Sequence, residues 1–469
     1  MAIEVLDRIF KAYDIRGLVD EEITEDIAFA IGSSFALFLM KEREPATVVI
    51  GEDMRPSSPL LAEAFADGVN SQGFDAIQIG LCSTDGLYFA SGKLNLPGAM
   101  FTASHNPAAY NGIKLCKSQA RPIGQESGLA RIKAQVIEGA PLPHRALGKV
   151  STRNLLNDYV DYLFSLFKSE AFSGSFAGRQ LIIGVDAGNG MGGYTAPAVL
   201  SRVNAKVESL YFDLDGTFPN HEANPIDAKN MVDLQELVRS KKCDIGLAFD
   251  GDADRCFIVD ERGELVSPSA MTALIASREL ALHPRSAVIY NLICSQAVPE
   301  IIRESGGKPI RSRVGHSFIK GLMADHDAIF GGEHSGHFYF KNFWRADSGM
   351  LAALHVIAAL LENGQPLSEL IAPFNRYHLS GEINTKVADT SESIAKVRTY
   401  FASLPSIEFD ELDGLTVINT AVGEERRFNL RPSNTEPLLR LNAEARGAGQ
   451  MKAISSQVLD LLKSQDRKS

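Results

Sequence analysis

Hydrophobic and polar positions alternate between two kinds of segment in the first part of the chain. Apolar runs at 46–51 (ATVVIG) and 75–80 predict buried strands, and the run at 10–17 predicts a further strand that ends in a glycine turn. Segments 25–40 and 58–72 carry apolar residues at helical spacing and predict amphipathic helices. Because strands that alternate with helices build sheets with helices on their faces, the pattern predicts an α/β fold.

Polar, proline-bearing stretches divide this pattern. PLPH at 141–144 indicates a domain boundary near residue 150, and IAP at 371–373 indicates another near residue 370. The length of 469 residues alone suggests about three domains of roughly 150 residues each. The segment after 370 is predicted to form a smaller α+β unit.

Composition excludes several classes of partner. The formal net charge is −11, with a single Trp and no Lys/Arg cluster, so a nucleic-acid partner is not expected. The five cysteines form no C-x-x-C pair, which fits a reducing cytosol. The apolar segment 28–40 is too short to span a bilayer, and the N-terminal residues lack the pattern of a signal peptide. These features predict a cytoplasmic protein without membrane contact.

The segment 101–114 (FTASHNPAAYNGIK) contains the first candidate for chemistry. An apolar run ends just before Ser104, and an Asn-Pro turn follows, so the pattern predicts a strand end that delivers Ser104 into a loop. A serine hydroxyl is a weak nucleophile that needs a base, a metal or prior modification. An isolated Ser-His pair is more often a turn that caps backbone groups, so its interpretation depends on the rest of the chain.

The second candidate is DGDADR at 250–255, which follows one apolar run and precedes another. Asp250, Asp252 and Asp254 alternate with small residues and can surround one hard cation with oxygen ligands. An EF-hand would require Gly where Arg255 stands, and helices rather than strands on both sides. Because three unpaired carboxylates would repel one another, the motif predicts a divalent metal site.

Two further motifs resemble other kinds of enzyme. GNGMGG at 188–193 matches the G-x-G-x-x-G pattern of dinucleotide-binding folds, with Asp213 and Asp215 near the position of a ribose-binding acid. DLDGT at 213–217 resembles the nucleophile motif of haloacid-dehalogenase-type phosphatases. Both lie in mid-chain, no hydride-transfer partner is evident, and 218–221 turns instead of starting a helix. Both functional interpretations stay open but are not favoured, and the family resemblance described below implies that both motifs are scaffold.

RPSNTEP at 431–437 combines a guanidinium fork, hydroxyls and backbone N–H groups in one turn. These groups can hold a phosphate dianion, although such a turn is structural as often as not when it occurs alone.

Four motifs in their order along the chain resemble one family, the α-D-phosphohexomutases, in particular its phosphomannomutase/phosphoglucomutase branch. They are TASHNP at 102–107, DGDADR at 250–255, GEHSGH at 332–337 and RPSNTEP at 431–437. The resemblance spans essentially the whole chain. It implies three α/β domains with mixed sheets and a smaller α+β C-terminal domain around a central cleft, so four domains replace the estimate from length.

The resemblance assigns one part of the reaction to each domain. The expected domains are 1–150 with a phosphoserine loop, 151–258 with the metal-binding loop, 259–370 with a sugar-recognition loop, and 371–469 for phosphate binding.

The resemblance also implies a mechanism. Ser104 is expected to carry a phosphate, with Mg²⁺ held by Asp250, Asp252, Asp254 and a phosphate oxygen on Ser104. A sugar 1-phosphate attacks through its 6-hydroxyl, and the hexose 1,6-bisphosphate that forms serves as intermediate and activator. The expected catalytic residues are Ser104, His105, Lys114, Arg255 and His337.

Substrate contacts are expected from residues that match other family positions: Tyr13, Arg16, Arg313, His316, Glu333, Ser335, Arg431, Ser433, Asn434, Thr435 and Arg440. One departure concerns Ile293, where relatives often carry Lys. A cationic contact to the substrate phosphate that lies away from Ser104, called the distant phosphate, therefore comes from Arg313 or is missing.

The terminal His of GEHSGH and the SNTEP sequence resemble the mannose/glucose branch more than the glucosamine branches. The expected activity is that of a phosphomannomutase, with phosphoglucomutase activity alongside. Phosphoglucomutase and phosphoglucosamine mutase remain alternatives, and a haloacid-dehalogenase-type phosphatase or a non-catalytic sugar-phosphate-binding protein is less favoured. The expected partners are hexose phosphates, and the chain is expected to be a monomer or homodimer.

Overall fold

The computed structural model describes residues 3–139, 147–168, 170–421, 423, 425–432 and 438–463, without the side chains of 316 and 317. The chain divides into two compact units. One comprises Met1–Ser267 with Ser335–Leu370, and the other comprises Pro268–His334 with Ile371–Ser469. Each unit is described by itself.

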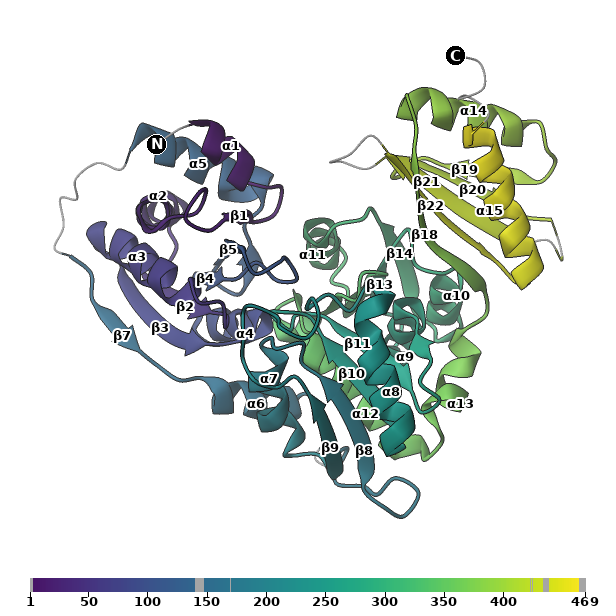
Figure 1. The fold of residues 1–469 in the computed structure, drawn as a ribbon, viewed down its shortest axis with the longest axis horizontal. Coiled ribbons are helices and arrows are strands. Elements are labelled where there is room, and N and C mark those ends of the chain that lie inside the picture. Colours follow the sequence, from purple (N-terminus) through teal and green to yellow (C-terminus); the bar gives the residue numbers. More distant parts are fainter. Residues whose placement is uncertain are drawn as a thin grey trace. The chain divides into compact units, whose positions relative to one another are not determined.

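The first unit begins with a mixed sheet in the order β1-β5-β4-β2-β3-β7, with β6 paired to β5 (Figure 1). Strands β4, β2, β3 and β7 are parallel, whereas β5 runs antiparallel to both β4 and β1. In chain order the strands are β1 (Ile15–Leu18), β2 (Thr47–Glu52), β3 (Asp75–Leu81), β4 (Gly98–Phe101), β5 (Tyr110–Lys117), β6 (Arg121–Pro122) and β7 (Val150–Thr152).

Helices cover both faces of this sheet. On one side α2 (Glu25–Glu42) and α3 (Ser58–Ser71) share a core with α1 (Ile3–Ile9) and α5 (Ala130–Glu138), while α4 (Thr84–Leu94) lies on the other (Figure 1). The backbones of α2 and α3 approach closely at two glycines, since a Cβ at Gly32 would lie 2.2 Å from the Phe65 carbonyl oxygen. The strand predicted for 10–17 is wrong in its first half, because β1 begins only at Ile15, and its predicted glycine turn is wrong, because β1 continues through Gly17 to Leu18.

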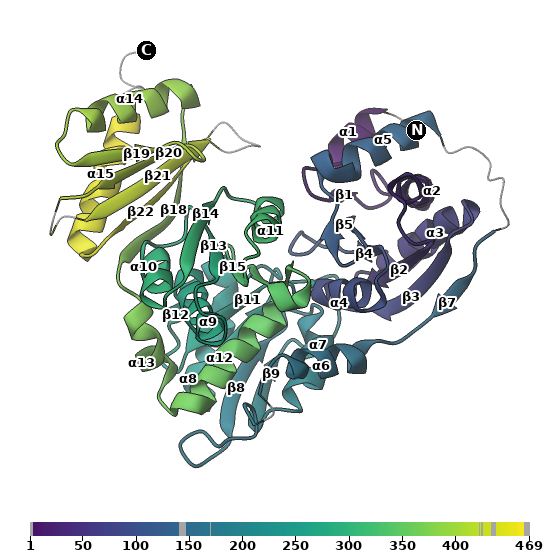
Figure 2. The ribbon, with the colours of Figure 1, turned by 180° about the vertical axis from the view of Figure 1, so that it is seen from behind.

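A second mixed sheet in the first unit has the order β12-β11-β10-β8-β9. Helix α8 (Val232–Lys241) covers one face, and α12 (Gly349–Asn363) crosses the other (Figure 2). The strands are β8 (Leu181–Asp186), β9 (Ala205–Leu210), β10 (Ile245–Phe249), β11 (Cys256–Asp260) and β12 (Leu265–Val266). Helices α6 (Leu156–Ser165) and α7 (Gly192–Leu200), and the strand pair β16 (Phe338–Phe340) and β17 (Ala346–Asp347), also belong to this unit.

The second unit contains three parallel strands and an antiparallel sheet. The parallel strands β13 (Ala287–Asn291), β14 (Lys308–Ser312) and β15 (Phe330–Gly332) lie with α9 (Pro268–Leu282), α10 (Ala297–Glu304) and α11 (His316–Asp325). The antiparallel sheet has the order β18-β22-β21-β20-β19, and α14 (Thr390–Ala402) and α15 (Ala448–Lys463) share its core. Its strands are β18 (His378–Lys386), β19 (Ile407–Asp410), β20 (Leu415–Asn419), β21 (Arg426–Pro432) and β22 (Leu438–Ala445).

The observed layers confirm the predicted fold class of mixed α/β sheets followed by a smaller α+β unit. The predicted domain boundaries and the central cleft stay predictions. In the described part of the chain, every helix is too short or too polar to cross a bilayer.

A buried carboxylate joins several elements of the first unit. Asp85, in the first turn of α4, accepts hydrogen bonds from the hydroxyls of Ser83, Tyr159 (2.8 Å) and Ser348 (2.6 Å). Ser348 is the N-cap of α12, and Tyr159 lies on α6. Burial raises the pKa of Asp85 to about 6, although the three hydroxyls act to lower it. The packing of these helices is therefore linked to the protonation of Asp85.

We expect this proton to appear in the pH dependence of stability. Because the folded-state pKa of Asp85 lies above its usual value of 3.8, its favourable contribution is present below about pH 4 and is lost as the pH rises through 6. Between pH 4 and pH 7 the wild type should lose about 2 kcal/mol of unfolding free energy relative to Asp85→Asn, whose side chain does not titrate. Thermal unfolding at several pH values measures the difference, with the exposed Asp67→Asn as control. Parallel profiles for wild type and Asp85→Asn would contradict it.

Candidate active site

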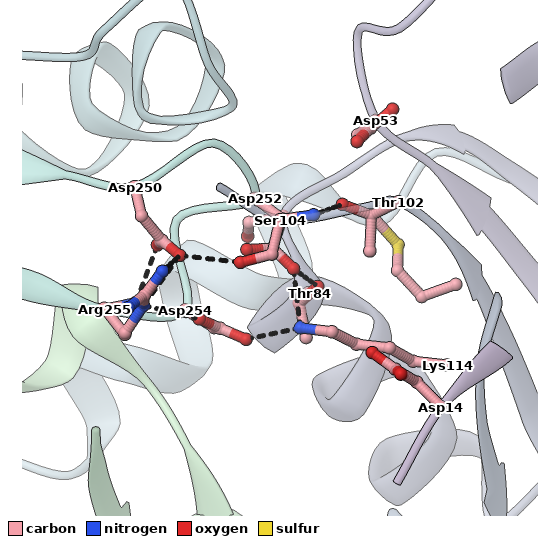
Figure 3. A network of polar contacts seen from close by, with 12 residues as sticks. Asp14, Asp53, Thr84, Thr102, Ser104, Lys114, Asp250, Asp252, Asp254 and Arg255 are labelled. Atoms are coloured by element: carbon pink, nitrogen blue, oxygen red, sulfur yellow. Dashed lines mark hydrogen bonds and ion pairs between the residues drawn. The ribbon is translucent and has the colours of Figure 1, made fainter. Parts of the chain in front are cut away.

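Ser104 lies in the loop between β4 and β5. It has a left-handed backbone (φ 49°), is 4% exposed, and donates its N–H to the Thr102 hydroxyl at 2.9 Å. Its own hydroxyl donates to Asp250 Oδ2 at 2.9 Å (Figure 3). It also lies 3.2 Å from His105 Nδ1. The loop thus brings the candidate nucleophile to the candidate metal ligands.

The three aspartates lie in the turn between β10 and β11. All are at most 2% exposed, and each offers an oxygen within 4.8 Å of the others. The close approach of this turn to the serine loop requires a glycine, since a Cβ at Gly251 would lie 2.3 Å from the Ser104 carbonyl oxygen. The glycine-rich loop after β8 supports the turn from the other side, where Met191 N–H donates to the Gly251 carbonyl at 2.9 Å.

Two cations and a hydroxyl contact the aspartates (Figure 3). Lys114, on β5, places Nζ 2.7 Å from Asp252 Oδ2 and 2.6 Å from Asp254 Oδ2. Arg255 Nε donates to Asp250 Oδ2 at 2.8 Å. Thr84, at the start of α4, donates its hydroxyl to Asp252 Oδ2 at 2.6 Å and its N–H to the Asp252 carbonyl at 3.0 Å.

This arrangement fits a hard divalent cation. The buried Oδ1 atoms of Asp252 and Asp254 accept no hydrogen bond from any described residue. Buried carboxylate oxygens without a partner are costly, and a Mg²⁺ ion would satisfy them with the oxygen ligands it prefers. Asp250, Asp252 and Asp254 are therefore the residues that could hold Mg²⁺.

The surroundings shift the pKa values of the three aspartate carboxyls in different directions. Burial raises the pKa of Asp250 to about 7, against the lowering effect of Arg255. For Asp252 and Asp254 burial also acts to raise the pKa, but the ion pairs with Lys114 outweigh it and hold both pKa values below the usual range. Lys114 is held in the charged form in turn, because the two carboxylates raise its pKa more than burial lowers it.

His105 is neutral in this environment. Burial and the neighbouring Arg255 lower its pKa to about 3. Arg255 Nη2 lies 2.5 Å from His105 Nδ1, and because a guanidinium can only donate, Nδ1 must accept. His105 therefore presents a hydrogen-bond acceptor to Arg255 and adds no positive charge beside Ser104.

His337 approaches the aspartates from the loop before β16. Its Nε2 lies 3.8 Å from Asp254 Oδ1, and its Nδ1 lies 3.1 Å from the Ser335 hydroxyl. Asp254, His337 and Asp347 also form a group whose ligand atoms lie within 4.8 Å of one another. The structure thus places two residues of the GEHSGH motif next to the aspartate turn.

Arg16 contacts the serine loop directly. Its Nη1 donates to Asn106 Oδ1 at 2.6 Å, and its Nη2 donates to Asp14 Oδ2 at 2.5 Å. Tyr13 immediately precedes Asp14 and is half-buried. Arg16 therefore reaches the loop that carries Ser104.

Sequence reasoning missed the residue that shapes this loop. Arg55 is 1% exposed and donates to the carbonyl oxygens of Ser104 (2.9 Å), Asn106 (2.7 Å), Pro107 (2.9 Å) and Tyr110 (2.9 Å). Its position three residues after β2 gives no signal of this role, because its partners are backbone carbonyls. Thr84 was missed as well, because a single Thr forms no motif.

Other predicted residues belong to the second unit. Glu333 is 3% exposed, and its Oε1 accepts from Gly315 N–H at 3.3 Å. Arg313 Nε donates to the Leu412 carbonyl at 3.0 Å, while Arg431 and Arg440 both face Glu382. The side chain of His316, and the whole of Ser433, Asn434 and Thr435, lie outside the described residues.

The two alternative motifs have structural contacts. Asp215 Oδ1 accepts from both the N–H and the hydroxyl of Thr217, which closes a local turn. Asp213 is exposed, and its carbonyl accepts from Asn189 Nδ2 at 2.9 Å. These contacts support the interpretation of both motifs as scaffold.

Comparison with known proteins connects this site to one family. Models of four phosphoglucomutase/phosphomannomutase domains match in order: alpha/beta/alpha domain I at 7–141, domain II at 157–263, domain III at 267–377 and the C-terminal domain at 382–461. This chain belongs to the phosphoglucomutase/phosphomannomutase family. The match confirms the resemblance in the motifs and the four-domain organisation that it implied.

Relatives in the family cover nearly the whole chain. A phosphomannomutase of Salmonella montevideo is 37% identical over 465 residues, which is 97% of this chain and 99% of the relative. A phosphomannomutase of Escherichia coli K12 is 37% identical over 463 residues, covering 97% and 98%.

A solved structure shows the same fold in a family member. A phosphoglucomutase/phosphomannomutase family protein from Burkholderia thailandensis has a TM-score of 0.87 at 28% identity, covering 98% of both chains.

Proposed function

We propose that this protein is a phosphomannomutase that interconverts mannose 1-phosphate and mannose 6-phosphate, and that it also acts on the glucose phosphates. One observation carries the proposal: the Ser104 hydroxyl lies 2.9 Å from Asp250 in a buried group of three aspartates with Lys114 and Arg255. Ser104 lies beside carboxylates that Lys114 and Arg255 partly neutralise. It is well placed to carry a phosphoryl group whose charge is balanced by cations.

Ser104 gives its phosphoryl group to the sugar and then takes the other phosphoryl group of the bisphosphate. The substrate 6-hydroxyl attacks the phosphorus on Ser104, the P–O bond to Oγ breaks, and hexose 1,6-bisphosphate forms. After the bisphosphate has turned, Ser104 Oγ attacks the phosphorus of the 1-phosphate, the P–O bond to the C1 oxygen breaks, and hexose 6-phosphate is released with its 1-hydroxyl protonated. When bound by Asp250, Asp252 and Asp254, Mg²⁺ supplies charge neutralisation for the transferred group.

The chain's own residues supply the remaining charge and the proton transfer. Arg255 and Lys114 bring positive charge to the group, which favours the charge distribution of phosphoryl transfer. The attacking hydroxyl must lose its proton, and we assign this role to His337, whose Nε2 is 3.8 Å from Asp254 Oδ1. Lys114 is less suited to accept it, because two carboxylates keep it protonated.

The rest of the substrate is held by residues that match the family's positions. We assign the sugar hydroxyls to Glu333 and Ser335, because a carboxylate accepts from adjacent hydroxyls. The distant phosphate and the remaining cleft contacts are assigned to Tyr13, Arg16, Arg313, His316, Arg431, Ser433, Asn434, Thr435 and Arg440.

A coupled assay tests the proposal. With Mg²⁺ and a trace of glucose 1,6-bisphosphate, we expect turnover of mannose 1-phosphate and of glucose 1-phosphate, both lost on chelation. Because mannose and glucose differ at one hydroxyl, discrimination between them should be modest. Turnover of glucosamine 1-phosphate with neither of these would overturn the choice of branch. Asp213→Asn should keep full activity, whereas a haloacid-dehalogenase-type phosphatase would lose it.

We further propose that the enzyme acts in the cytoplasm as a monomer or homodimer. All five cysteines are buried and free, which suits a reducing compartment. Light scattering of the purified protein measures its mass in solution.

A further inference from the structure

Two arginines proposed to hold the distant phosphate face each other in the C-terminal sheet. Arg431 on β21 is paired directly with Arg440 on β22. Like charges at directly opposed positions on neighbouring strands destabilise a sheet. A neighbouring anion would offset the repulsion between Arg431 and Arg440, and a residue of the same sheet supplies it.

Glu382, on the adjacent strand β18, is this anion. Its Oε2 accepts from Arg431 Nη2 at 3.1 Å, and its Oε1 lies 3.6 Å from Arg440 Nη1. The carboxylate uses one oxygen for each arginine. The three side chains are partly buried, at 28% exposure for Glu382, 11% for Arg431 and 32% for Arg440, so their charges interact more strongly than on an open surface.

With a phosphate ester bound, this cluster would carry one more negative charge than positive charges. Two guanidinium groups match one phosphate dianion, and the Glu382 carboxylate adds a third negative charge. The Arg431 Nε donor is buried and makes no hydrogen bond to any described residue. Arg431 Nε is thus available to donate to a bound anion, while the Glu382 carboxylate competes with that anion for the two guanidinium groups.

We propose that Glu382 is an internal competitor of the substrate phosphate: it holds the two arginines in place and weakens their affinity for a phosphate monoester. This inference rests on the proposed function. In that reaction the bisphosphate must leave the arginines, turn and bind them again with its other phosphate. We call Arg431 and Arg440 the phosphate clamp. A clamp that binds phosphate too tightly stabilises the bound intermediate and slows this step. Glu382 is thus a positioning residue that sets the strength of the clamp.

Removal of its charge tests the proposal. Glu382→Gln keeps an oxygen acceptor for Arg431 but no charge, so the full-length protein should bind inorganic phosphate roughly tenfold more tightly by isothermal titration calorimetry. The gain should shrink in high salt, because the charges are partly exposed. In the mutase assay KM and kcat should both fall, since ground-state binding rises while turning slows. Glu408→Gln, an exposed residue of the same sheet, should leave affinity and kinetics unchanged.

The outcomes separate this inference from the proposed function. If Arg431→Ala has the phosphate affinity of the wild type, the arginines do not hold phosphate and the proposed clamp is wrong. If Arg431→Ala weakens binding but Glu382→Gln binds phosphate with unchanged or lower affinity, the clamp stands and the competitor role of Glu382 is refuted. The unfolding midpoint of each variant shows that it is folded, so a loss of structure cannot mimic either result.

Discussion

Replacement of Ser104 by alanine should lower the turnover of mannose 1-phosphate by at least about 1,000-fold. Ser104 would donate a phosphoryl group in the first half-reaction and accept one in the second, and no other described hydroxyl lies within hydrogen-bonding distance of Asp250 Oδ2. Stability should change little, because alanine loses only the hydrogen bond from the hydroxyl to Asp250. The coupled assay measures the loss, and intact-mass spectrometry should show one phosphate on the wild type and none on Ser104→Ala.

Ser165→Ala is the matched control, since Ser165 is an exposed serine on α6 of the same unit. It should keep both its phosphate and its activity. Full activity in Ser104→Ala would remove the phosphoserine from the mechanism. A phosphate that stays on the variant would place the modification at another residue.

The sequence predicted the fold class because burial follows local periodicity. Segment 245–249 (IGLAF) carries no polar side chain and forms the central strand β10, buried along its length. The failure at 10–17 has a physical reason too. Phe10 and Ile15 pair with each other in an antiparallel bridge, so the chain folds back on itself between them and segment 10–17 is not one strand.

The sequence predicted those parts of the candidate site whose residues are contiguous in the chain. The aspartate turn and the serine loop each keep their residues together in sequence, so spacing carries the signal. Thr84 and Asp252 are 168 positions apart, and their contact exists only because α4 begins against the turn after β10. Arg55 likewise acts through backbone carbonyls, which leave no trace in residue identity. Single residues that act through tertiary contacts cannot be found by motif.

Asp252→Asn should abolish the response of the protein to Mg²⁺ while leaving its fold intact. In the wild type, Thr84 and Lys114 both donate to Asp252 Oδ2. An asparagine must present its amide oxygen to these two donors, so its NH₂ group replaces Oδ1, the buried atom that accepts no hydrogen bond from the described chain. Positively polarised N–H groups then face the position proposed for the cation, and one of three ligand charges is lost.

The concentration of Mg²⁺ that gives half-maximal activity should rise at least about 100-fold, in line with the loss of a charged ligand. Mg²⁺ should raise the unfolding midpoint of the wild type, because a ligand that binds only the folded state stabilises it, and should leave that of Asp252→Asn unchanged. Glu264→Gln removes an exposed charge shortly after β11 and should behave as the wild type. The midpoint without Mg²⁺ should differ little between wild type and Asp252→Asn, since the variant loses an ion pair with Lys114 but also relieves repulsion among the aspartates. An equal Mg²⁺-dependent shift in both proteins would show that the cation binds elsewhere, and the electrostatic basis of the proposed phosphoryl transfer would fail with it.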